Sequence, residues 1–322
     1  MTVRGSPVTG TRDRIGGSFM SGNEKASGKA GGLPRRQFVR LSGVAGTAAL
    51  LAGTGAGKDL AAATRSPSHA TCPPGAAPCP SPSAICGHPG DSGPRDYLWL
   101  EVQVAEGTKN PPPPDTSLLT TPSYVILHGG PKTGHNFLLV PSCRISGIEC
   151  PFVWGPTAYP GYWNDAWEQA QPGGAAPVKY PSIGLGINSA IPGIRMQDQL
   201  HIHMAGILSG VQGQLNKLEA AGKITSSPAK WPAQVVPVEG RDPKTGKAAT
   251  RHYRALIFRD KPELKQNLFM FLGDHVPAAK MHMADQILVV TPRNKGGFYV
   301  LNSDPGVTGG GTGSADFLLV YK

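Results

Sequence analysis

Residues 197–205 carry the clearest alternation of polar and hydrophobic positions in the chain, reading Gln-Asp-Gln-Leu-His-Ile-His-Met-Ala. The period is two, and successive side chains of an extended strand point to opposite faces of a sheet. Leu200, Ile202 and Met204 can therefore pack into a core on one face. The polar residues of the opposite face are Gln197, Gln199, His201 and His203. Imidazoles and carboxamides in these positions indicate chemistry on the polar face.

The same periodicities predict an α+β domain with a mostly antiparallel sheet and flanking helices. Segments 182–187 and 199–206 form a hairpin around the turn at Pro192-Gly193, which brings Asn188 near the mouth of the histidine face. Further strands are expected at 123–127, 136–140, 252–258, 287–291, 298–301 and 317–321. Helices are expected at 162–171, 211–221 and 262–272.

Three interpretations of His201 and His203 are open. They can be strand residues without a task. They can bind zinc, for which neutral imidazole is a common ligand, although no third ligand lies at ordinary local spacing. They can also serve nucleophilic catalysis, in which one imidazole attacks an electrophile and its neighbour orients it or handles the proton. The pair alone leaves all three open; the neighbouring segments decide among them and favour the third, with no metal and no cofactor.

Three regions are expected along the chain: an export-signal region at 1–63, a disordered linker rich in Pro, Ser and Cys at 64–95, and one folded domain at 96–322. Paired arginines, Arg35 and Arg36, precede a short apolar stretch at 44–51 and three alanines at 61–63. This order is typical of a twin-arginine signal, and a short amphipathic helix is the alternative. We therefore expect an exported, extracytoplasmic protein of the cell envelope or membrane surface.

The net charge of +10 does not indicate nucleic-acid binding. Residues 1–63 contain nine basic and three acidic residues, so the remainder of the chain carries only +4. No basic stripe with interleaved aromatic residues is present. A modest positive balance is ordinary for a protein that works near anionic lipid.

Five cysteines follow the leader: Cys72, Cys79, Cys86, Cys143 and Cys150. Export implies an oxidising destination, so structural disulfides are favoured, with Cys143–Cys150 as the expected pair. An odd count leaves at least one thiol free or paired between chains. Zinc is the alternative, but the six-residue gaps differ from the two-residue gaps of zinc knuckles.

The order Asn188, His201-Ile202-His203 resembles the signature of the histidine triad superfamily of nucleotide hydrolases and transferases, with Gln199 where the first histidine of that signature stands. Residues 137–151, Phe-Leu-Leu-Val-Pro-Ser-Cys-Arg-Ile-Ser-Gly-Ile-Glu-Cys-Pro, resemble a block of bacterial CDP-diacylglycerol pyrophosphatases, a divergent branch of that superfamily. The aromatic cluster at 162–167 and the segment 276–283 extend the resemblance, which covers roughly residues 95–322.

The resemblance implies a histidine triad-like fold and hydrolysis of CDP-diacylglycerol to CMP and phosphatidate through a nucleotidyl-histidine intermediate. His201 would attack phosphorus, and His203 would contact phosphoryl oxygens or hold the tautomer of its neighbour. Substrate contacts are expected from Asn188 to ribose or the nucleophile, from Gln197 and Gln199 to phosphate, and from Arg144 to phosphate. A structural salt bridge is the alternative for Arg144.

Two rival functions remain open at this stage. One is a histidine triad-like hydrolase or transferase of another nucleotide diphosphate, and the other is a degenerate, non-catalytic protein that binds lipid or nucleotide. A lipid substrate also implies peripheral membrane contact, and the oligomeric state is open. Candidates for an apolar contact surface, with a core stripe as the alternative, are Trp163, Trp167, Leu264, Leu268, Phe269 and Phe271.

Overall fold

The computed structural model describes residue 79 and residues 86–109, 115–129, 136–156, 158–180, 182–259 and 263–321. The expected export signal, including Arg35 and Arg36, lies outside the described residues, as does Cys72. Among the described helices, none has the length and apolar character needed to cross a membrane.

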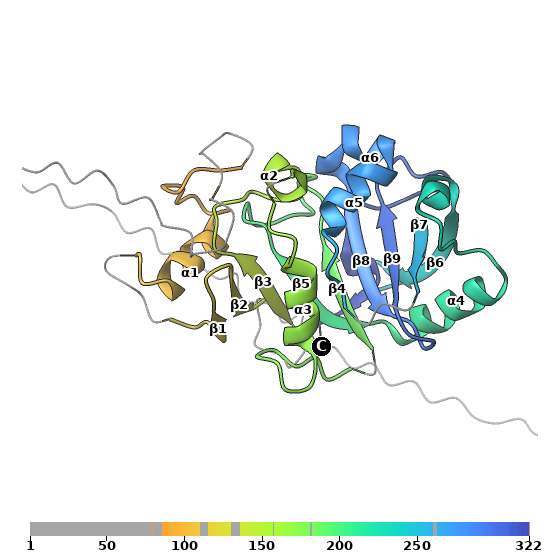
Figure 1. Cartoon of the computed structure of the whole chain (residues 1–322), viewed down its shortest axis with the longest axis horizontal. Helices are drawn as coiled ribbons and strands as arrows, with labels where there is room; N and C mark the ends of the chain where they lie inside the picture. Colours follow the sequence, from red (N-terminus) through yellow and green to blue (C-terminus); the bar gives the residue numbers. More distant parts are fainter. Residues whose placement is uncertain are drawn as a thin grey trace, which may run out of the picture. The chain divides into compact units, whose positions relative to one another are not determined.

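In the described part of the chain, ten strands form one antiparallel sheet, which confirms the predicted α+β class. The strand order is β1-β2-β3-β5-β4-β8-β9-β7-β6, and β10 pairs with β5 (Figure 1). The strands are β1 Leu119–Thr120, β2 Tyr124–His128, β3 Phe137–Pro141, β4 Ile183–Ile187, β5 Ile202–Ile207, β6 Val235–Arg241, β7 Ala248–Phe258, β8 Ile287–Pro292, β9 Phe298–Ser303 and β10 Leu319–Val320.

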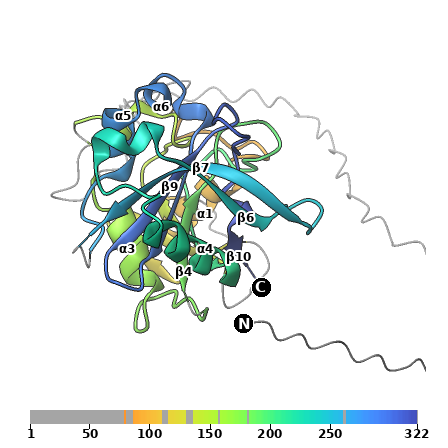
Figure 2. The ribbon, with the colours of Figure 1, turned by 90° about the vertical axis from the view of Figure 1, so that its right-hand side faces the viewer.

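Helices flank the sheet on both faces. The α-helices are α1 Tyr97–Ala105, α2 Pro151–Trp154, α3 Tyr162–Ala170, α4 Ser209–Ala220, α5 Leu268–His275 and α6 Pro277–Met281, and the 3₁₀ turns are η1 Pro228–Ala233, η2 Met283–Asp285 and η3 Ala315–Phe317. Helices α3 and α5 lie on the same side of the strands, and β10 lies toward the other side (Figure 2). Trp163 of α3 and Phe269 of α5 are in ring contact there, with centroids 5.4 Å apart.

The two faces of β5 bury different clusters. Ile202 and Met204 face the cluster that contains the buried residues of α3 and α5. Ala205 and Ile207 face a second cluster, which is built from α4, β6–β9 and the segment after β9. A third cluster joins α1 to Leu138 of β3. Because Leu138 pairs with His203, the histidine face of β5 lies between the α1 cluster and the second cluster.

The sheet repeats one topology twice. The order β2-β3-α3-β4-β5 recurs as β6-β7-α5-β8-β9, and the halves meet where β4 pairs with β8. At this junction Gly186 pairs with Val289. The partner of Gly186 on β5 is His203, whereas the partner of Val289 on β9 is Leu301. The second half therefore has an aliphatic residue at the position related to His203.

Glycines in β4 make room for the segment that follows β9. A Cβ atom on Gly184 would lie 2.5 Å from the Leu319 side chain, and one on Gly186 would lie 2.8 Å from it. Gly186 also has Ala315 of η3 beside it. Since Gly184 and Gly186 share the histidine face with His203, the C-terminal segment packs directly beside the histidines.

Most predicted elements are present, with three differences at their ends. The expected strand at 199–206 begins only at Ile202, because Leu200 donates its backbone N–H to Ile145 in the loop after β3. The helix expected at 262–272 begins at Leu268, where the Asn267 side chain caps the backbone N–H groups of the first turn. The strand expected at 317–321 is a 3₁₀ turn followed by the two residues of β10.

Gly240 offers a test of how tightly η3 is seated. A Cβ atom at Gly240 would collide with the carbonyl oxygen of Phe317, whereas one at Gly213 inside α4 meets open space. We expect Gly240→Ala to lower the free energy of unfolding by about 1–3 kcal/mol. Gly213→Ala should raise it by about 0.5–1 kcal/mol, because alanine has the higher helix propensity. Urea unfolding of both variants with intact disulfides measures the difference, and equal effects would contradict this packing.

Candidate active site

His201 and His203 lie side by side, with ring centroids 4.9 Å apart and planes at 70°. His203 lies in β5, and His201 directly precedes that strand. His201 is 9 % exposed and His203 is half-buried, so both rings keep some contact with solvent. The structure therefore brings the two predicted histidines together at a partly accessible position.

A single hydrogen bond fixes the tautomer of His201. Its Nδ1 lies 2.7 Å from the backbone carbonyl oxygen of Gln199. A carbonyl oxygen only accepts, so Nδ1 carries the proton and donates it. In the neutral ring Nε2 then holds a free lone pair, which is the form that a nucleophilic imidazole requires.

Asn188 fixes the tautomer of His203 in the same way. The Asn188 Oδ1 accepts from the backbone N–H of Ala315 at 2.7 Å, which identifies the other amide atom as nitrogen. That nitrogen lies 3.4 Å from Nε2 of His203, so Nε2 accepts and Nδ1 carries the proton. Nδ1 of His203 is buried and has no hydrogen-bond partner among the described residues. The structure thus places Asn188 where the sequence predicted it, at the histidine face.

Both rings are neutral near pH 7. Burial lowers the pKa of His201 to about 3, with the charge of a protonated His203 acting in the same direction. Burial also lowers the pKa of His203. Arg195 lowers the pKa of His201 further, whereas Asp316 acts to raise the pKa values of both rings. A neutral imidazole is therefore available well below the usual range of histidine titration.

Asp316 and Tyr321 belong to the site although the sequence analysis did not identify them. The Asp316 carboxylate lies 3.4 and 3.5 Å from Nδ2 of Asn188 and accepts a hydrogen bond from the Tyr321 hydroxyl. The Tyr321 ring lies 5.6 Å from that of His203. Burial and the neighbouring Asp316 raise the pKa of Tyr321. No periodic pattern connects residues more than 100 positions apart, so only the fold reveals this contact.

Gln199 supports the site from outside rather than facing a phosphate. Its Nε2 donates to the carbonyl oxygens of Pro141 and Cys143, at 3.1 and 2.8 Å. Its Oε1 accepts from the Ile145 N–H at 3.1 Å and from Arg144 at 3.2 Å. Both amide hydrogens are used, and the side chain is fully buried. The expectation that Gln199 donates to phosphate is therefore corrected: it anchors the backbone that holds His201.

Gln197 and Arg144 are likewise engaged with protein groups. The Gln197 Oε1 accepts from the Leu98 N–H at the start of α1, at 3.1 Å. The buried Arg144 guanidinium pairs with Asp91 at 3.0 Å and with Asp96 at 2.6 Å. The structural salt bridge, the alternative for Arg144, is therefore present, and Gln197 is held through its amide oxygen. A contact of either side chain with phosphate stays a prediction.

The loop after β3 is built around a second buried arginine. Arg195 pairs with Glu149 at 2.6 Å and with Asp198 at 3.1 Å. Gly147 leaves the space for it, because a Cβ atom there would collide with the Arg195 guanidinium. Gly147 and Glu149, the glycine and the glutamate of the block at 137–151, thus both accommodate the Arg195 side chain.

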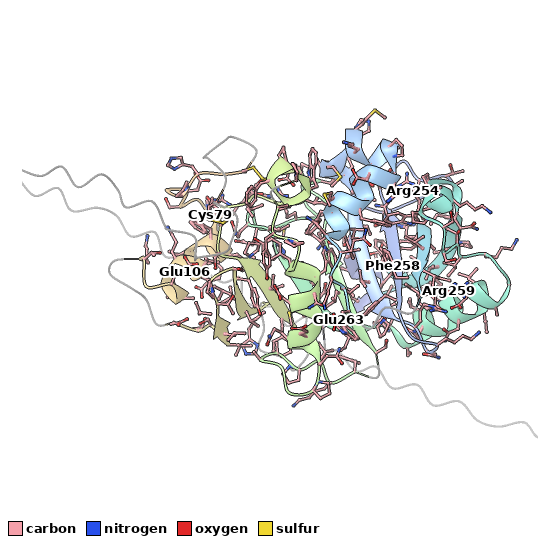
Figure 3. The ribbon with its side chains drawn as sticks, viewed as in Figure 1. Cys79, Glu106, Arg254, Phe258, Arg259 and Glu263 are labelled. Atoms are coloured by element: carbon pink, nitrogen blue, oxygen red, sulfur yellow. A yellow bond between two sulfur atoms is a disulfide. The ribbon has the colours of Figure 1, made fainter. Side chains whose placement is uncertain are left out.

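Two disulfides fasten this loop, Cys79–Cys143 and Cys86–Cys150 (Cys79 is labelled in Figure 3). The predicted Cys143–Cys150 pair is wrong, because each of these cysteines is joined to one 64 residues upstream. The described segment 86–95, part of the expected disordered linker, is accordingly attached to the domain. Structural disulfides were expected, and the pairing connects the linker to the loop rather than closing the loop on itself.

The expected apolar surface beside the site is core instead. Trp163, Leu264, Leu268, Phe269 and Phe271 are buried, in agreement with the alternative of a core stripe, and Trp167 is partly buried. A hollow is lined by Phe258, Leu264, Leu268 and Phe298 together with Glu263 (Phe258 and Glu263 are labelled in Figure 3). Its apolar residues belong to, or pack against, the cluster on the face opposite the histidines. Within the described residues, no three His, Cys, Asp or Glu side chains are grouped so as to hold a metal ion.

A comparison with protein-family models shows which family the chain matches. The model described as CDP-diacylglycerol pyrophosphatase covers residues 93–319, more than two thirds of the 322-residue chain. The matched span contains both histidines, Asn188 and Asp316. It begins in the segment that pairs with Arg144.

The role of Gln199 as an anchor can be tested by removing its amide. Gln199→Met would leave the Pro141 and Cys143 carbonyls and the Ile145 N–H without partners in a buried position. We expect a loss of about 3 kcal/mol in the free energy of unfolding. Gln197→Met removes one bond at a partly exposed position and should cost less than about 1 kcal/mol. Equal stability of the two variants in urea unfolding would show that Gln199 is not an anchor.

Proposed function

The chain belongs to the CDP-diacylglycerol pyrophosphatase family and hydrolyses the phosphorus-containing anhydride CDP-diacylglycerol, and we propose that it does so by two successive displacements at phosphorus, the first made by a histidine. The substrate is CDP-diacylglycerol, in which a pyrophosphate joins cytidine to a lipid. The products are CMP and phosphatidate. The observation that carries the proposal is the free Nε2 lone pair of His201, fixed by the Nδ1–H donation to Gln199.

In the first displacement, Nε2 of His201 attacks the phosphorus on the CMP side. A phosphorus–nitrogen bond forms, the bond from phosphorus to the bridging oxygen breaks, and its electron pair leaves with phosphatidate. A neutral imidazole avoids the repulsion that a negatively charged phosphodiester exerts on hydroxide. The low pKa of His201 supports this role, because the attacking form needs no deprotonation at neutral pH.

In the second displacement, water attacks the same phosphorus. The new phosphorus–oxygen bond forms, the phosphorus–nitrogen bond breaks, and the electron pair returns to Nε2 of His201. CMP leaves, one proton passes to solvent, and the ring is again neutral. The solvent oxygen therefore ends in CMP and not in phosphatidate.

His203 and Asn188 support the transfer. The Nδ1–H of His203 is a buried donor without a protein partner, and such groups are uncommon unless they serve a function. We assign it to a phosphoryl oxygen of the bound substrate, where a donor stabilises developing charge. Asn188 holds Nε2 of His203 as the acceptor and thereby keeps the proton on Nδ1.

The nucleophile is tested by CMP release from CDP-diacylglycerol in detergent with excess EDTA. We expect His201→Ala to lower kcat by about a thousandfold or more, since the attacking group itself is lost. His252→Ala, which removes a partly buried histidine of β7 that takes no part in the proposed mechanism, should keep the wild-type rate. Turnover by His201→Ala, or loss of wild-type activity in EDTA, would contradict the mechanism.

We also propose that the protein works outside the cytoplasm at a membrane surface. The two cystines support an oxidising compartment. Met196 and Tyr97 are 67 % and 56 % exposed, and they lie on segments joined by the hydrogen bond between Leu98 and Gln197. Met196 lies shortly before His201 in the chain, and exposed apolar side chains of this kind support peripheral contact with the lipid that carries the substrate.

Replacement of the paired arginines tests this location. We expect Arg35→Lys combined with Arg36→Lys to retain the protein in the cytoplasm with reduced cysteines, because the twin-arginine signal is lost. Cell fractionation and thiol labelling give the readout, and Arg40→Lys serves as the control. An unchanged membrane-associated, oxidised fraction in the double variant would disprove the export route.

A further inference from the structure

The segment after β9 supplies a carboxylate to the histidines that the two-step mechanism does not use. Asp316 lies in η3, with its backbone N–H bonded to the Ser314 side chain at 3.2 Å. Ser314 also donates to Oδ1 of Asn188 at 3.3 Å. The turn therefore binds both polar atoms of the Asn188 amide. Ser314 and Ala315 donate to its oxygen, and the Asp316 carboxylate accepts from its nitrogen.

From this arrangement, and resting on the proposed function, we infer that Asp316 is a positioning residue of the reaction: it orients Asn188 and supplies the negative charge that stabilises positive charge on the imidazoles. The argument has a steric part and an electrostatic part. The steric part is the orientation of Asn188. Its Nδ2 has two hydrogens and faces two acceptors, Nε2 of His203 and the Asp316 carboxylate, so each hydrogen has a partner.

The electrostatic part follows from the chemistry of His201. When Nε2 bonds to phosphorus while Nδ1 keeps its proton, the ring becomes a cation. The groups that act on it are His203 and Arg195, which disfavour a positive charge, and the Gln199 carbonyl and Asp316, which favour one. Burial disfavours the charge as well. The Asp316 carboxylate therefore acts together with the hydrogen bond to the Gln199 carbonyl to offset the cost of forming a cation in a buried place.

Tyr321 holds the carboxylate in position. Its hydroxyl donates to Oδ1 of Asp316, and its ring lies beside His203. The cation–π contact of Arg251 with Phe317, at 4.7 Å, fixes the turn from its outer side. Asp316 is consequently supported by neighbours in η3, directly after β10 and in β7.

The test compares Asp316→Asn with Asp304→Asn in the full chain. Asp304 is likewise a partly buried carboxylate, and it follows directly after β9, where it is ion-paired with Arg254 at 2.8 Å. We expect Asp316→Asn to lower kcat by about tenfold to a hundredfold with little change in KM, because the lost interaction acts on the transition state. Asp304→Asn should lower stability and leave kcat of the folded protein unchanged.

The pH profile separates an electrostatic role from a structural one. Asp316 raises the pKa values of His201 and His203, so its removal lets them fall further. The acid limb of kcat/KM should therefore move to lower pH in Asp316→Asn. In Asp316→Glu, kcat should be partly restored and the acid limb should lie closer to its wild-type pH. Tyr321→Phe, which keeps the carboxylate, should lose less in kcat than Asp316→Asn.

The outcomes distinguish this inference from the mechanism beneath it. If His201→Ala is inactive but Asp316→Asn keeps the wild-type kcat and acid limb, the role of Asp316 is refuted and the mechanism stands. A loss in Asp316→Asn that matches the loss of folded protein, with an unchanged profile, also refutes it. If His201→Ala stays active, the mechanism itself fails.

Discussion

The hydrogen bond from Nδ1 of His201 to the Gln199 carbonyl leaves Nε2 as the ring nitrogen with a free lone pair. Its position depends on Gln199, whose side chain makes four hydrogen bonds to the end of β3 and to the loop that follows. That loop is fastened in turn by cystines at Cys143 and Cys150. The orientation of Nε2 of His201 thus depends on the Gln199 carboxamide and backbone, and these depend in turn on disulfides to Cys79 and Cys86. A site that must present a lone pair at a fixed place needs such a rigid frame.

In the proposed mechanism, burial has opposite effects on the two stages of histidine chemistry. It keeps the rings neutral and therefore nucleophilic, but it makes the cation that forms on attack expensive. The fold meets both demands by placing one carboxylate beyond Asn188, near enough to act through space but without direct contact to His201. The glycines of β4 permit this arrangement, because Leu319 and Ala315 occupy the space where side chains at Gly184 and Gly186 would lie.

Patterns of short range in the chain were predictable, and contacts between distant segments were not. Alternation identified His201 and His203, and the hairpin brought Asn188 to them. Gln199 also follows the alternation, yet backbone bonds of the loop after β3 draw it away from the strand ladder, and period alone cannot report such competition. The cystine pairing and Asp316 depend on approach between segments 64 and more than 100 residues apart, for which composition and spacing carry no signal.

The repeated topology has a consequence for how the chain can change over time. If two identical subunits formed such a sheet, every substitution would appear twice, and a loss at one histidine position would be a loss at both. Here both halves belong to one chain, so Leu301 packs in the second cluster while His203, at the related position, lies in the candidate site. The pairing of β4 with β8 is intramolecular, so completion of the sheet does not depend on protein concentration. Covalent fusion of the halves allows one to specialise in chemistry and the other in support.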